Sequence, residues 1–131
     1  MKINFETEKI DTPAWKCREL TANIDGKTAR VIVNVYPNVR QVTISRLETP
    51  VKKRGIGTIL LAKAAHELAK EMPEISDFNV VHQSITPNGI AHLKRIGLRK
   101  IANNNPEIRM NFDVYRTILT HKVKTLGIKL D

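Results

Sequence analysis

Hydrophobic and polar residues alternate along the first half of the chain, and this alternation predicts β-strands separated by short turns. The predicted strands cover 15–24, 28–36 and 40–47. The pair Asp25-Gly26 lies between the first two strands and is typical of a tight hairpin turn. In the third strand, strict alternation places Leu47 on the face opposite Val42 and Ile44.

Further along the chain, apolar residues recur every three to four positions, which is the period of an amphipathic helix. A long helix is predicted over 57–72, and Pro73 marks its end. Two further helices are predicted over 86–97 and 116–126, with Gly127 capping the last. Short strands are predicted over 78–83, 98–101 and 108–115. This order of elements predicts a single α/β (α+β) domain over 1–131.

The composition narrows the class of protein. Aromatic residues make up only 5% of the chain, so the core is expected to be aliphatic. Cys17 is the one cysteine, which excludes an internal disulfide and favours a reducing, cytoplasmic location. No signal peptide and no apolar run near ~20 residues is present, so no membrane contact is expected. Metal-ligand spacings are also missing, and no metal site is predicted.

Positive charge dominates the chain. Lysine and arginine number 22 against 13 acidic residues, for a net charge of +9, and the excess lies in 26–56 and 78–131. This distribution favours an anionic ligand, an acidic substrate or nucleic acid, and charge alone does not choose among them.

One basic, glycine-containing motif lies just before a predicted helix. The run Lys52-Lys53-Arg54-Gly55-Ile56-Gly57 lies between a predicted strand and the long helix. The first N–H groups of a helix lack partners and attract anions, and glycines let a ligand approach the backbone. The sequence therefore predicts a phosphate site here. Leu60 stands where the dinucleotide fingerprint needs its third glycine, and no P-loop is present.

The stretch from Leu47 to Leu61 resembles the acyl-CoA loop of the GNAT N-acetyltransferase family, and 91–98 resembles its second helix. The resemblance implies a mixed, mainly antiparallel sheet flanked by helices, in a compact variant without the usual N-terminal helices. It also implies that acetyl-CoA enters a notch where the strand ending at Leu47 and the strand starting at Phe78 splay apart. The implied cofactor-binding residues are Leu47, Lys52, Lys53, Arg54, Gly55, Ile56, Gly57, Thr58, Thr86 and Asn88.

The catalytic residues are not assigned by this resemblance. Leu93 occupies the position of the family's frequent tyrosine acid, and the strand before the loop lacks the frequent carboxylate. Candidates for a general base are Glu48, His82 and His92.

Two classes of function therefore remain as hypotheses. The first is an N-acetyltransferase that moves acetyl from acetyl-CoA to an unidentified amine acceptor. The alternative is a non-catalytic binding or structural module of the same fold, using basic faces on nucleic acid or a protein partner. The missing tyrosine and carboxylate favour the alternative, although no aromatic-rich basic strand is present to stack bases. The oligomeric state is not predicted.

Overall fold

The computed structural model describes residues 4–24, 26–49, 55–82 and 108–127. The strands are β1 (Asn4–Asp11), β2 (Lys16–Ile24), β3 (Lys27–Tyr36), β4 (Gln41–Glu48), β5 (Asn79–His82) and β6 (Ile108–Asn111). The helices are α1 (Ile56–Glu71) and α3 (Phe112–Thr125), with short 3-10 turns η1 (Pro37–Val39) and η2 (Pro73–Asp77). The predicted helix over 86–97 and strand over 98–101 lie outside the described residues.

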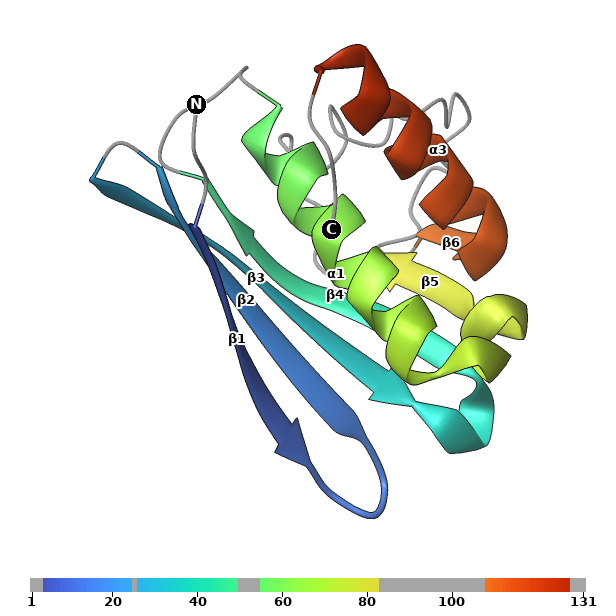
Figure 1. The fold of residues 1–131 in the computed structure, drawn as a ribbon. Helices are drawn as coiled ribbons and strands as arrows, with labels where there is room; N and C mark the ends of the chain where they lie inside the picture. The colour runs from blue at the N-terminus through green and yellow to red at the C-terminus, as the bar shows by residue number, and fades with distance from the viewer. Residues whose placement is uncertain (1–3, 25, 50–54, 83–107, 128–131) are drawn as a thin grey trace.

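The described strands form one sheet in which each strand lies beside the next one in the chain. All neighbours are antiparallel except β4 and β5, which run parallel. A parallel pair needs a crossover connection, and α1 lies within it. Figure 1 shows α1 and α3 side by side over one face of the sheet. The predicted α+β class with a mainly antiparallel sheet is thus confirmed.

The core lies between this face of the sheet and the two helices. Val31, Val33 and Val35 of β3 are all fully buried, as the period of a half-covered strand requires. They belong to one cluster with the apolar stripe of α1, in which Leu60 and Leu68 are buried. Aliphatic side chains dominate this core, as the composition predicted. No helix in the described part of the chain is long and apolar enough to cross a membrane.

A β-bulge in β4 makes one predicted side-chain direction wrong. Ile44 pairs with Val33, but the next β3 residue, Ile32, pairs with Arg46, so Ser45 is an extra residue in the ladder. Leu47 therefore lies on the helix side, where it packs against the core, instead of opposite Ile44. Strict alternation fails here because a single inserted residue reverses the side-chain directions that follow it.

The boundary between β6 and α3 also differs from the prediction. The strand predicted over 108–115 ends at Asn111, and the helix begins at Phe112 instead of Arg116. The Asn111 side chain accepts hydrogen bonds from the N–H of Asp113 at 2.9 Å and of Val114 at 3.3 Å, so it caps the helix. The buried positions in α3 then recur at helical spacing, at Phe112, Tyr115, Leu119 and Val123.

β1 was not predicted, because its pattern of burial is weak. Phe5 and Thr7 are half-buried, whereas the remaining described residues of this edge strand are exposed. Thr7 donates a hydrogen bond to Glu67 of α1 at 3.2 Å, and the Lys63 Nζ lies 5.7 Å from the centre of the Phe5 ring. These contacts between β1 and α1 stabilise the edge strand, and no periodic pattern in the sequence predicts them.

The start of α1 and the end of α3 meet at one end of the molecule. Gly55, which precedes α1, has a φ of 74°, and a Cβ placed on it would lie 2.8 Å from Cδ1 of Leu126. The two helices are therefore antiparallel, with the end of α3 beside the beginning of α1 (Figure 1). Gly127 also has a positive φ, so the predicted glycine cap of this helix is confirmed.

Gly55→Ala is expected to destabilise the protein by about 1–2 kcal/mol, because alanine is strained in the left-handed region. The Leu126 methyl group that its Cβ would meet ends an exposed side chain and can turn aside. Gly26→Ala is the matched control, since Gly26 has a φ of 78° and open space around it. Urea unfolding should show comparable losses for the two variants, because both glycines have the same kind of backbone conformation. A much larger loss for Gly55→Ala that disappears in the Leu126→Ala background would show instead that Leu126 cannot turn aside.

Candidate functional site

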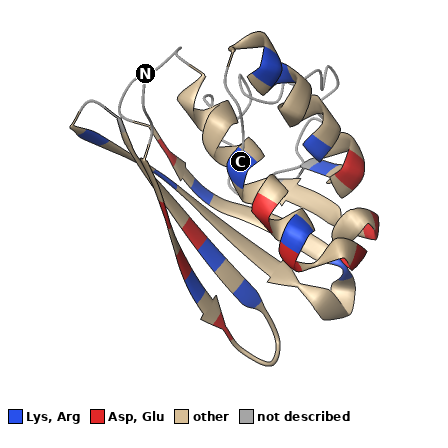
Figure 2. Ribbon diagram, in the orientation of Figure 1, with Lys and Arg blue, Asp and Glu red and all other residues tan. Residues whose placement is uncertain are grey.

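Unpaired positive charge gathers at the C-terminal end of α3. Lys122 and Lys124 are exposed in the last turns of this helix, and we call these two side chains the basic end of α3. In the described part of the chain, neither forms an ion pair with a carboxylate. Figure 2 shows the blue segments at this end of the helix. Cations here also complement the negative end of the helix dipole.

The cations elsewhere on the described surface are neutralised or scattered. Arg46 lies 2.7 Å from Glu48, Arg116 lies 3.3 Å from Asp113, and Arg40 pairs with Asp77. The lysines without an ion pair in the described ranges lie apart on β2, β3 and α1; they are Lys16, Lys27 and Lys70. The basic end of α3 therefore places two lysines without a carboxylate partner in the described ranges within three consecutive residues, on either side of the buried Val123.

The predicted phosphate-binding turn lies beside this end of α3. Gly55 is the N-terminal cap residue of α1, no side chain caps the helix, and the first described helical bond joins the Ile59 N–H to the Gly55 carbonyl. Ile56 and Thr58 have buried side chains, so they would meet an anion only through their backbone. A Cβ on Gly57 would lie 3.4 Å from Leu47, an ordinary packing distance, so packing alone does not demand glycine there.

Most of the remaining predicted site residues lie outside the described residues. They are Lys52, Lys53, Arg54, Thr86, Asn88 and His92, together with the side chain of His82. Glu48 is described: it ends β4, its side chain is half exposed, and it is engaged by Arg46. Among the described residues, no group of His, Cys, Asp and Glu could hold a metal ion.

The described part of β5 lies beside the first half of β4. Every residue of β5 pairs with β4, from Gln41 with Asn79 to Ile44 with His82. The second half of β4, Ser45–Glu48, has no described partner on the β5 side, and the residues after His82 lie outside the described part of the chain. The described sheet therefore does not test the notch that the resemblance implied beside Leu47. Neighbouring parallel strands joined by hydrogen bonds leave no backbone groups free for a ligand over this length.

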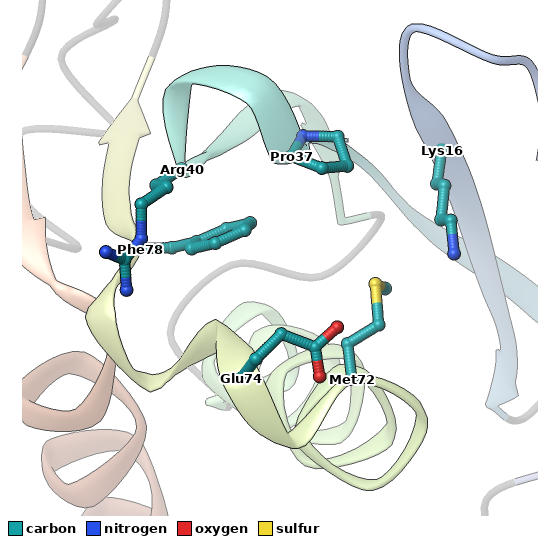
Figure 3. A pocket seen from close by; sticks show the side chains of 6 residues that line it. All are labelled: Lys16, Pro37, Arg40, Met72, Glu74 and Phe78. Atoms are coloured by element: carbon teal, nitrogen blue, oxygen red, sulfur yellow. The ribbon is translucent and has the colours of Figure 1, made fainter.

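A hollow of about 410 Å³ lies instead at the other end of α1 (Figure 3). Its lining combines apolar side chains with charges of both signs, from Lys16, Pro37, Arg40, Met72, Glu74 and Phe78. The arginine is already paired with Asp77, and the glutamate repels anions. This mixed lining does not select a polyanion, so the hollow does not compete with the basic end of α3 for such a ligand.

A second charged cluster, near this hollow, serves the fold. Arg18 of β2 is only 3% exposed, and its guanidinium donates to Glu71 at 2.7 Å and to Asp11 at 2.6 Å. Lys9 adds a 3.0 Å contact to the same glutamate. The hydrogen bonds from Arg18 lower the pKa of Glu71 to about 2. Because these charges cancel locally, the cluster joins β1, β2 and α1 without offering a free cation.

Comparisons with known proteins give a match in fold alone. No family model matches the chain, and no curated protein matches it. Solved structures do match; one is a chain in "The crystal structure of KacTA-DNA complex". It aligns with a TM-score of 0.54 and 13% sequence identity, over 85% of this chain and 76% of that one. At this identity the match supports a shared fold and transfers no residue roles.

These findings overturn the assignment to the GNAT N-acetyltransferases. No family model matches the chain, and a similar solved structure is a DNA complex. The prediction of an acetyl-CoA-dependent acetyltransferase is therefore wrong by these comparisons, and acetyl-CoA stays an unsupported ligand. The alternative interpretation, a module that binds nucleic acid, agrees better with them.

Proposed function

We propose that this protein binds nucleic acid through the basic end of α3. The observation that carries the proposal is the pair of exposed lysines, Lys122 and Lys124, without a carboxylate partner in the described part of the chain. The net charge of +9 adds a long-range attraction for any polyanion. The fold match to a chain in a KacTA-DNA complex favours nucleic acid over other anions.

The chemistry of such binding is electrostatic. A lysine that neutralises a phosphate releases the counterion condensed there, so the affinity falls as the salt concentration rises. Two lysine contacts predict a slope of log K against log salt of about −2 or steeper. Between 50 and 200 mM salt, this slope corresponds to a roughly fifteenfold loss of affinity.

Fluorescence anisotropy with a labelled DNA duplex of about 20 base pairs tests the proposal at 50, 100 and 200 mM salt. The expected dissociation constant near physiological salt is in the range of about 1–100 μM, as for sequence-independent binding. The slope should be about −2 or steeper. If no binding is detected at 50 mM salt up to about 100 μM protein, or if affinity does not depend on salt, the proposal fails.

A further inference from the structure

The described surface differs from that of a typical single-strand-binding protein in where its aromatic side chains lie. All six aromatic residues of the chain lie in described segments. Phe78, Phe112 and Tyr115 are buried in the core, and Phe5 is half-buried beneath Lys63. None of the six is exposed, so the described surface offers no aromatic platform for bases.

The two remaining aromatic residues lie far from the basic end of α3. Trp15 precedes β2 and Tyr36 ends β3, and both are half-buried. In Figure 1 the β1–β2 turn and the end of β3 are at the lower end of the sheet, whereas α3 ends at the top. Aromatic stacking on these two residues therefore cannot combine with phosphate contacts at the basic end of α3.

The exposed face of α3 itself carries short polar side chains and lysines. Besides Lys122 and Lys124, its exposed residues in the C-terminal half are Thr117, Thr120, His121 and Thr125. His121 supplies one imidazole ring, whereas proteins that hold single strands stack successive bases on several rings. Hydroxyl groups and lysines instead contact phosphate oxygens, which carry no sequence information.

We infer that the basic end of α3 takes a nucleic-acid duplex in preference to a single strand, by contacting phosphates. This inference rests on the proposed function and narrows it. A duplex presents one negative charge per about 1.7 Å of axis, twice the density of one strand at the same rise. Lys122 and Lys124 of α3 are therefore attracted more strongly to a duplex than to one strand. A single strand would need base stacking as compensation, for which the described surface offers no exposed phenylalanine, tyrosine or tryptophan.

The test compares a labelled duplex of about 20 base pairs with one of its own strands, at 100 mM salt. We expect the duplex to bind at least about fivefold more tightly. The salt slope should also be steeper for the duplex, because each neutralised phosphate contributes about −0.9 there and about −0.7 on a single strand. The Lys122→Gln/Lys124→Gln variant should lose most of the preference, and Lys27→Gln/Lys70→Gln should keep it.

The outcomes separate the two claims. If neither nucleic acid binds, the proposed function fails together with the inference. If both bind but the single strand binds equally or more tightly, the inference alone is overturned. A duplex preference that survives in the Lys122→Gln/Lys124→Gln variant would overturn the assignment to the basic end of α3.

Discussion

Reversing both charges at the basic end of α3, in the Lys122→Glu/Lys124→Glu variant, is expected to weaken duplex binding about 100-fold at 100 mM salt. Each substitution removes one phosphate contact and adds a negative charge that repels the backbone. A tenfold loss for each position corresponds to about 1.4 kcal/mol. The slope of log K against log salt should also become shallower by about 2, one for each lost contact. Anisotropy titrations over the same salt series measure both effects.

The matched control is Lys27→Glu/Lys70→Glu, which changes the net charge by the same amount at two exposed positions on β3 and α1. It should lower affinity only slightly, since it acts through the long-range field alone, which salt screens within about 10 Å. Urea unfolding must show that both double variants keep their stability. Equal losses in the two variants would mean that net charge drives binding and that the α3 site is wrong.

Arg18→Ala is expected to destabilise the fold by about 2–3 kcal/mol, the largest stability effect that the structure predicts. The guanidinium is nearly fully buried and holds Glu71 through two hydrogen bonds and Asp11 through a third. Removing the guanidinium leaves a void and takes charged hydrogen bonds away from both carboxylates. The Asp11 and Glu71 side chains are 50% and 29% exposed, so water partly replaces those bonds. Urea unfolding near pH 7 measures the loss.

Lys9→Ala is the control for this cluster, because it removes an exposed contact to the same glutamate. Exposed pairs contribute at most about 1 kcal/mol, so this variant should stay close to the wild type. A loss below about 1.5 kcal/mol for Arg18→Ala would contradict the buried role of the arginine.

The pH dependence gives the Arg18 prediction a second readout. The pKa of Glu71 is about 2 in the folded protein, against a reference value of 4.5. A carboxylate with a lowered folded pKa stabilises the fold above its unfolded pKa, and this stabilisation is lost as pH falls through the folded value. The stability gap between wild type and Arg18→Ala should therefore be full above about pH 5 and shrink as pH falls toward 2. A gap that is constant from pH 7 to pH 2.5 would show that packing, and not the charge, carries the effect.

Periodic segments were the most predictable part of the fold. The alternation in β2, β3 and the first half of β4 and the helical stripe of α1 appear in the structure within about one residue of the predicted bounds. Burial of one face requires these periods, so the local pattern carries the information. β1 and the start of α3 were missed or misplaced, because Thr7–Glu67 and the Asn111 cap depend on partners or on single residues and not on a period.

The candidate site was harder to predict from the sequence than the fold. The cations of 122–124 belong to an excess of charge that the sequence does report, but many other lysines and arginines share that excess. Ion pairs separate them from Arg18, Arg46 and Arg116, which face carboxylates, whereas Lys122 and Lys124 do not in the described part of the chain. Their shared place at one helix end separates them from Lys16, Lys27 and Lys70, which also lack an ion pair there but lie apart. The resemblance of the glycine turn to an acyl-CoA loop also led to the wrong prediction of an acetyltransferase. One short motif is compatible with several ligands and functions, so it does not identify one of them.

The amino-acid sequence by itself determined the class of fold, the aliphatic core and the positive charge, because periodicity and composition are properties of the chain. The tertiary structure decided the rest. It made Ser45 an extra residue in the β4 ladder and so turned Leu47 inward, and it placed Gly55 at the start of α1 beside Leu126 at the end of α3. It also left Lys122 and Lys124, at one helix end, without carboxylate partners in the described residues. The reason is physical: an ion pair or a packing contact forms between residues distant in sequence, and only the folded chain brings them together.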